Sequence, residues 1–177
     1  EIPLSGFESM TPTYQFIKNI LRYNKDLKID ADHLMSISPD QGGMRRAIYI
    51  ANVLGINMGM FYKRRDYTTV SNGVHPVVAH EFLGSVVEGK DIIIIDDMIS
   101  SGDKVLETAQ LLKRKKCRKV IICATFVIFT GGISRFDDAY KRGLFDMLIP
   151  TNLVSQPEEL LQKPYYVNCD MSKYLDL

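Results

Sequence analysis

Two adjacent carboxylates, Asp96 and Asp97, follow a run of four isoleucines in the stretch KDIIIIDDMISSGDKVLETAQLL, residues 90–112. The isoleucine run predicts a strand that is buried on both faces and ends at the two carboxylates. A short polar loop, SSGDK (100–104), and a helix come next. Carboxylates suit sugar hydroxyls or a metal ion, whereas the unpaired N–H groups of a helix N-terminus suit phosphate. The stretch therefore has the polarity of a sugar-phosphate site.

Within this loop, Ser100 and Ser101 add hydroxyl donors, and Gly102 lets the backbone approach a ligand closely. A purely structural interpretation competes with this one. One of the serines would cap the helix, and the two aspartates would simply be solvated. On the residues of this stretch alone, the two interpretations are evenly matched.

A second stretch, SISPDQGGMRRA (36–47), repeats the arrangement with a strand, Asp40, two glycines and a helix. A Pro-Asp turn before a glycine-rich helix start is also frequent without any function. Because both loops are expected at the carboxyl edge of one sheet, finding them together favours a binding site.

A third stretch, FYKRRDYTTVSNGVHP (61–76), carries the cations Lys63, Arg64 and Arg65 from a predicted strand into a loop with few apolar residues. Ordinary solvated charge would explain such a cluster. The functional interpretation is a catalytic flap, mobile from about residue 64 to residue 73, that brings Lys63 and Arg65 onto phosphate oxygens.

Strands and helices alternate along the whole chain. Strands are expected at 32–38, 57–62, 81–87, 92–95, 119–126 and 146–150, and helices at 10–25, 42–55, 103–116, 134–143 and 155–161, with a long loop at 63–80. This order predicts an α/β fold, a doubly wound parallel sheet with helices on both faces. In such folds ligands bind beyond the carboxyl ends of the strands.

The bulk properties narrow the class of protein. The chain has 177 residues and a net charge of +1, which suits a single domain over 1–177 and gives no field that favours nucleic acid. The basic run KRKKCRK (113–119) is expected to be a solvated helix end, and no apolar run is long enough for a bilayer. Three cysteines without a CxxC pair favour a cytoplasmic location. Because the chain does not begin with Met, we expect a fragment or a processed chain.

Taken together, the three stretches resemble the motifs of the ribose-phosphate pyrophosphokinase (PRPP synthetase) family, which has the type I phosphoribosyltransferase fold. SPDQGG is similar to the SPDxGG loop of the family, and KRRD to the start of its flexible catalytic loop. IIIIDDMISSGDK is similar to the ribose 5-phosphate loop, whose common form is VDDMIDTGGT. The resemblance extends over nearly the whole chain.

The resemblance implies a reaction in which the pyrophosphoryl group of ATP moves onto ribose 5-phosphate, giving PRPP and AMP. It also implies Mg²⁺ as cofactor and a homo-oligomer that meets neither nucleic acid nor membrane. The residues it points to are Lys63 and Arg65 for catalysis, Asp40 for the metal, Asp96 and Asp97 for ribose hydroxyls or metal, and Ser100, Ser101, Gly102, Asp103 and Lys104 for the 5-phosphate.

Some positions depart from the family pattern. Asp103 stands where Gly is usual, and Lys104 where Thr is usual. An acid facing phosphate is unfavourable, so Asp103 is expected to point away and Lys104 to compensate with charge. The chain also resembles only the C-terminal of the family's two similar halves. Because the other half supplies most of the ATP site, the 177-residue chain alone is expected to be inactive.

Two other functions compete with this one. A phosphoribosyltransferase that combines PRPP with a nucleobase shares the aspartate-rich loop, although SPDQGG and the KRR cluster weigh against it. A non-catalytic regulatory or assembly subunit of PRPP synthetase would tolerate the loop substitutions. Ligand binding separates the first alternative, because a transferase needs a nucleobase and a synthetase half needs ribose 5-phosphate alone.

Overall fold

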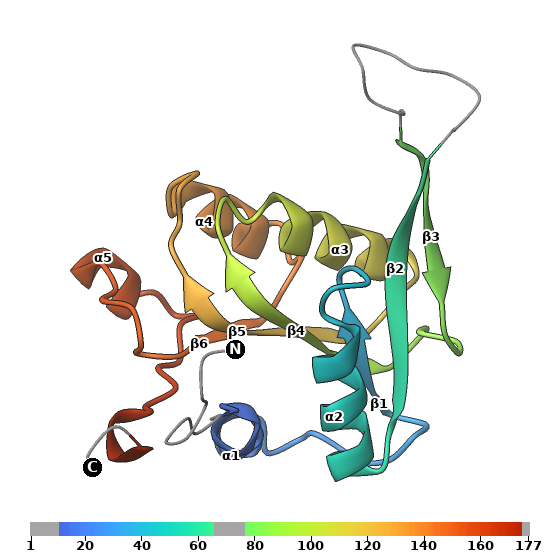
Figure 1. Ribbon diagram of the computed structural model, residues 1–177, viewed down its shortest axis with the longest axis horizontal. Coiled ribbons are helices and arrows are strands. Elements are labelled where there is room, and N and C mark those ends of the chain that lie inside the picture. Colours follow the sequence, from blue (N-terminus) through green and yellow to red (C-terminus); the bar gives the residue numbers. More distant parts are fainter. Residues whose placement is uncertain (1–10, 66–76, 175–177) are drawn as a thin grey trace, which may run out of the picture.

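The computed structural model describes residues 11–65 and 77–174, without the side chains of 63–65 and 77–80. The helices are α1 (Thr13–Tyr23), α2 (Met44–Leu54), α3 (Asp103–Arg114), α4 (Ser134–Lys141), α5 (Glu158–Leu161) and the 3-10 helix η1 (Ser172–Tyr174) (Figure 1). The strands are β1 (Leu34–Ser38), β2 (Asn57–Arg65), β3 (Val77–Leu83), β4 (Asp91–Ile99), β5 (Lys119–Val127) and β6 (Met147–Pro150). None of the helices in these ranges is long and apolar enough to cross a membrane.

The strands form one sheet in the order β3-β2-β1-β4-β5-β6. All neighbouring pairs are parallel except β2 and β3, which pair antiparallel. Parallel strands need a crossover connection, usually a helix, whereas antiparallel neighbours such as β2 and β3 do not. The predicted doubly wound sheet is therefore confirmed, with one antiparallel strand added at its edge.

Helices cover both faces of the sheet, as predicted. Figure 1 shows α3 and α4 on one side of the sheet and α1 and α2 on the other. Side chains of a strand alternate between its two faces. Ile92 and Ile94 accordingly pack in the core with α3 and α4, and Ile93 and Ile95 in the core with α1 and α2. All four are at most 2% exposed, which explains the unbroken isoleucine run.

Several element boundaries differ from the predictions, and those of β2, β3 and β4 lie nearest the expected site. β4 does not end at Ile95 but continues through both aspartates to Ile99, since it stays paired with β5 as far as Val127. β2 continues to Arg65 and β3 begins at Val77, so the predicted loop 63–80 is shorter. The strand predicted at 81–87 stops at Leu83, because Gly84 adopts a φ of 155°. Most of the predicted flap, which was expected at 64–73, lies outside the described residues, because these omit 66–76.

Candidate functional site

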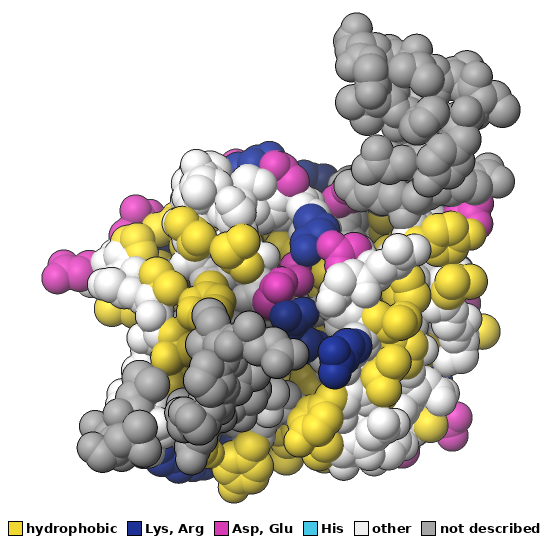
Figure 2. Space-filling model, viewed as in Figure 1, with side chains coloured by type: hydrophobic (Ala, Val, Ile, Leu, Met, Phe, Trp, Pro, Cys, Tyr) yellow, Lys and Arg dark blue, Asp and Glu magenta, His cyan; other side chains and the backbone are white. Residues whose placement is uncertain are grey.

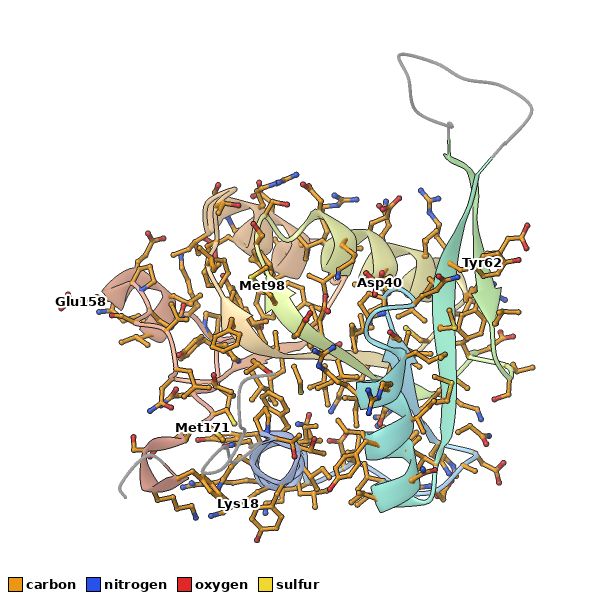
Figure 3. All side chains as sticks on the ribbon, viewed as in Figure 1. Lys18, Asp40, Tyr62, Met98, Glu158 and Met171 are labelled. Atoms are coloured by element: carbon orange, nitrogen blue, oxygen red, sulfur yellow. The ribbon has the colours of Figure 1, made fainter. Side chains whose placement is uncertain are left out.

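The loops that follow β1 and β4 meet at one edge of the sheet. The two strands are parallel neighbours, with Ile37 opposite Ile94, so their carboxyl ends lie side by side. Figure 3 labels Asp40 on the loop between β1 and α2. Figure 2 shows acidic and basic side chains gathered at the centre of the face toward the viewer. The structure thus brings Asp40 together with the two aspartates of β4 and the loop 100–104.

The two adjacent aspartates of β4 lie in opposite environments. The side chain of Asp96 is 1% exposed, whereas that of Asp97 is 54% exposed. Burial raises the pKa of Asp96 above its usual value, although Lys104 acts in the opposite direction. Burial also raises the pKa of Asp97, but contacts with Asp96 and Arg46 outweigh it, so that this pKa is lowered. Of these two aspartates, Asp97 is the one whose carboxylate is accessible at the surface.

Lys104, the second residue of α3, joins the two loops. Its Nζ lies 2.7 Å from Oδ2 of Asp96 and 3.0 Å from Oδ2 of Asp40. Burial lowers the pKa of the ammonium, but the hydrogen bonds to both carboxylates outweigh it and raise the pKa above the usual value. Lys104 was predicted among the phosphate-binding residues, and the structure places its charge between two carboxylates.

Asp40 is fixed by its own loop. Its Oδ1 accepts a hydrogen bond from the backbone N–H of Gly43 at 3.1 Å. Burial would raise the pKa of Asp40, but Lys104 and this N–H hold the pKa below its usual value. A Cβ on Gly43 would lie 2.6 Å from Oγ of Ser38 and 3.3 Å from the carbonyl oxygen of Ile95. Glycine is therefore needed there, so that α2 can start close to β4.

The polar loop 100–104 leads into the N-terminus of α3, as predicted. Gly102 caps the helix with a φ of 88°, and a Cβ there would meet the ring of Phe136 at 2.5 Å. The first turn of any α-helix has N–H groups without intrahelical partners. A cavity of about 240 Å³ lies against this loop and is lined by Asp96, Met98 and residues 99–105. One cavity thus touches both a carboxylate and a helix N-terminus.

Asp103, which also lines the cavity, has both carboxylate oxygens engaged by neighbouring side chains. Its Oδ2 accepts a hydrogen bond from Oγ of Ser101 at 2.7 Å, and its Oδ1 pairs with the guanidinium of Arg135 on α4. These two contacts, that of Ser101 first, lower the pKa of Asp103. Oγ of Ser100 is 3.1 Å from Oγ1 of Thr130, so that the segment before α4 braces the loop.

Sequence reasoning missed two basic residues of this site. Arg46 on α2 contacts Oδ2 of Asp97 at 3.1 Å, and Arg135 on α4 pairs with Asp103. The first had a usable signal, because Arg46 follows SPDQGG at the edge where Asp97 was expected. The second had none, since Arg135 lies more than thirty residues away from Asp103 in a helix with no motif.

Lys63 and Arg65 lie on the extended end of β2, where the described part of the chain includes their backbone and not their side chains. Met60 is the last residue of β2 that pairs with β1, opposite Ser38. Lys63 is three residues further along, about 10 Å beyond that pair at the usual rise of a strand. Figure 1 shows β2 and β3 reaching past the rest of the sheet. The catalytic roles of both residues stay predictions.

The acidic residues do not form a metal site by themselves. Within 11–65 and 77–174, no group of three or more His, Cys, Asp or Glu side chains is placed to hold a metal ion. The nearest approach to one is the pair Asp40 and Asp96, and an ammonium already stands between them. Mg²⁺ at Asp40 therefore stays a prediction, and the donors present do not fit a resident metal without a change at Lys104.

Comparison with known proteins shows which proteins the chain is similar to. The chain matches the phosphoribosyl transferase domain model over residues 14–162. The ribose-phosphate pyrophosphokinase of Mycoplasma pneumoniae is 36% identical over 70% of this chain and 36% of its own length. That of Vibrio parahaemolyticus is 31% identical over 81% of this chain and 43% of its own. The chain spans about two fifths of the length of these curated relatives.

The fold has a counterpart among solved structures. The crystal structure of phosphoribosylpyrophosphate synthetase from Mycobacterium smegmatis matches 94% of this chain and 48% of its own, with a TM-score of 0.73. The sequences are 22% identical, so this likeness concerns the fold alone.

Proposed function

Because the chain belongs to the phosphoribosyl transferase family, we propose that it is the ribose 5-phosphate-binding part of a ribose-phosphate diphosphokinase. The complete protein would transfer the pyrophosphoryl group of ATP to ribose 5-phosphate, giving PRPP and AMP. The curated relatives bear the name of this enzyme, and the three motifs of the sequence resemble theirs. Since the chain spans only part of these relatives, the complete reaction is proposed for the whole protein.

One observation carries the proposal: a single cavity is lined both by the carboxylate of Asp96 and by the N-terminus of α3, and the exposed Asp97 follows Asp96 on β4. The phosphate is proposed to meet the N–H groups of the first turn of α3 and the hydroxyls of Ser100 and Ser101. The ribose hydroxyls would then meet the exposed carboxylate of Asp97, while Asp96 holds Lys104 beneath the sugar. A ligand with a charged end and a hydroxyl end matches both halves at once.

The positive charge that assists transfer of the pyrophosphoryl group is proposed to come from residues outside the cavity. Phosphoryl transfer depends on positioning and on neutralising charge more than on covalent steps by the protein. Lys63 and Arg65, on the part of β2 that continues past the sheet, would supply that positive charge. Mg²⁺ would arrive on the phosphates of ATP, because Mg²⁺ commonly binds one or two carboxylates together with substrate phosphates. Asp40 is the carboxylate that the resemblance suggests for it, and a metal could bind there only if Lys104 left Oδ2 of Asp40.

Calorimetric titration of the 177-residue chain tests this function. We expect ribose 5-phosphate to bind, and ribose without its phosphate to bind at least ten-fold more weakly, since the helix N-terminus recognises the phosphate. We also expect no PRPP or AMP when ATP is added to this chain alone. Absence of ribose 5-phosphate binding would refute the proposal, and release of AMP would refute the inactivity of the chain.

The same titration separates the alternatives. A phosphoribosyltransferase would bind PRPP together with a nucleobase, and adding adenine or hypoxanthine should change nothing if our proposal holds. A non-catalytic subunit would fail to support PRPP synthesis even within the complete protein.

The proposal also includes a homo-oligomer, a single domain over 1–177 and a cytoplasmic location. Sedimentation tests the oligomer, limited proteolysis tests the single domain, and cell fractionation tests the location.

A further inference from the structure

We infer that Lys104 is the built-in counter-cation of Asp40 and Asp96, so that a divalent cation is excluded from this carboxylate pair. The inference concerns the same cavity. Only its consequence for sugar binding rests on the proposed function. Its central claim, that one position holds either the ammonium or a metal ion, stands on the geometry alone.

The ammonium occupies the place that a metal ion between the two carboxylates would take. Its nitrogen lies within 3.0 Å of one oxygen of Asp40 and one oxygen of Asp96. The side chain of Asp96 is 1% exposed, so water does not solvate its charge, and the charge needs a partner inside the protein. The two carboxylates come from different loops, and a cation between them removes their mutual repulsion.

All three groups are held in place by other contacts. The second oxygen of Asp40 accepts from the backbone N–H of Gly43, and Oδ1 of Asp96 accepts from that of Asp97 at 3.0 Å. The backbone of Lys104 is fixed in the first turn of α3, where its carbonyl accepts from Oγ1 of Thr108 at 2.8 Å. The ammonium therefore binds a preformed pair of carboxylates and is always at high local concentration.

Two chemical consequences follow. Carboxylate oxygens are hard donors that suit Mg²⁺ and Mn²⁺, but a divalent ion cannot share their space with an ammonium. An ammonium has three N–H donors. One is donated to Asp40, and Asp96 is held as an ion pair at 2.7 Å, so a donor remains for a sugar hydroxyl. Lys104 would thereby make binding of the sugar phosphate independent of divalent metal.

Titration with Mn²⁺, followed by electron paramagnetic resonance, tests the exclusion without any substrate. We expect Lys104→Met to bind one Mn²⁺ at least ten-fold more tightly than the unaltered chain. Adding Asp40→Asn to this variant should abolish the gain. Lys116→Met is the matched control, because Lys116 is an exposed lysine that pairs with Glu88 away from the cavity. Lys104→Gln is the second variant, in case the methionine variant does not fold. Equal Mn²⁺ affinity in the unaltered chain and in both Lys104 variants would overturn the inference.

A second measurement examines the consequence for the sugar. Ribose 5-phosphate should bind the unaltered chain equally, within two-fold, in EDTA and in Mg²⁺. The Lys104→Met variant should bind it at least ten-fold more weakly in EDTA and recover in Mg²⁺. If Mn²⁺ behaves as expected and ribose 5-phosphate never binds, the proposed function fails and the exclusion stands. A Mg²⁺ requirement in the unaltered chain would overturn the exclusion.

Discussion

Arg135 on α4 pairs with the carboxylate of Asp103 at the first position of α3, across the loop that leads into that helix. The other oxygen of the same carboxylate accepts from Oγ of Ser101. Both oxygens are thus engaged at a helix N-terminus that we propose to bind phosphate. A carboxylate released at this point would repel the oxygens of the phosphate.

Arg135→Ala should therefore weaken ribose 5-phosphate binding. We expect the Kd to rise about five-fold, as for the loss of an exposed charge partner. Adding Asp103→Asn should return the Kd to within about two-fold of the original, because the repelling charge is then gone. Calorimetry measures both, with Lys141→Ala on the same helix as control. A double variant as weak as Arg135→Ala would show that Arg135 acts on the ligand itself.

Asp96→Asn should raise stability and reduce binding together. The pKa of Asp96 is raised in the folded chain by burial, so the folded state binds the proton more tightly than the unfolded state. The ionised carboxylate therefore lowers stability above this pKa, and stability grows as pH falls through it. We expect Asn to raise the unfolding temperature at pH 7 and to weaken ribose 5-phosphate binding about ten-fold. Asp97→Asn is the comparison, with similar loss of binding and no gain in stability.

Gly43→Ala should damage both the fold and the site. The backbone of Gly43, with a φ of −84°, is open to alanine, so the effect isolates the close approach of α2 to Ser38 and β4. We expect a loss of about 1–3 kcal/mol in the free energy of unfolding, and weaker sugar-phosphate binding because Asp40 rests on this N–H. Gly143→Ala is the control: it has a φ of 68° and free space around it, and should lose about 1 kcal/mol with unchanged affinity. Denaturant unfolding and calorimetry decide.

Lys63→Ala and Arg65→Ala should slow turnover by the complete protein. If these cations stabilise charge on the transferred group, kcat falls about 10²-fold or more while KM for ribose 5-phosphate changes little. Arg64→Ala, between them in β2, is the matched control and should have a much smaller effect. Steady-state kinetics of PRPP formation measures kcat and KM separately for each variant. A rise in KM at constant kcat would show that the cluster only attracts substrate.

Acid should weaken the fold through Asp26. Hydrogen bonds from Lys119 and Arg118 lower the pKa of Asp26 from 3.8 to about 2. The unfolded chain then binds this proton at a higher pH than the folded chain, so the stabilisation is present above about pH 4 and is lost as pH falls toward about 2. Asp26→Asn should flatten the dependence of unfolding free energy on pH in that window. Asp32→Asn is the control, and an unchanged slope in Asp26→Asn would contradict the assignment.

The sequence predicted what depends on local pattern. Four isoleucines in a row indicated a strand buried on both faces, and Gly55 indicated the end of α2, where its φ is 66°. The two loops at the carboxyl edge followed from the order of strands and helices. Asp40 and Lys104 meet there because β1 and β4 are neighbours in the sheet.

Contacts between distant segments could not be read in the same way. Arg135 reaches Asp103 across the fold, and no spacing in the chain reveals that pair, whereas Arg46 at least follows the SPDQGG loop. The opposite environments of Asp96 and Asp97 follow from the continuation of β4 beside β5, which depends on tertiary pairing rather than on propensity. The antiparallel pairing of β2 with β3 was missed because residues 63–65 and 77–80 were assigned to a polar loop.

Because β4 lies in the middle of the sheet, residues on β4 tolerate substitution less well than residues at the start of α3. Asp96 and Asp97 follow the part of β4 that pairs with both β1 and β5, and at Asp96 the strand still pairs with β5, so an altered backbone there would disturb the sheet. Around the buried Gly102 of the loop 100–104, residues 100 and 101 precede α3 and residues 103 and 104 begin it, and these four side chains are exposed or half-buried. Substitutions can accumulate in that loop and retune ligand preference while the fold survives. The departures from the family pattern at Asp103 and Lys104 therefore alter the phosphate end of the cavity without altering the paired part of β4.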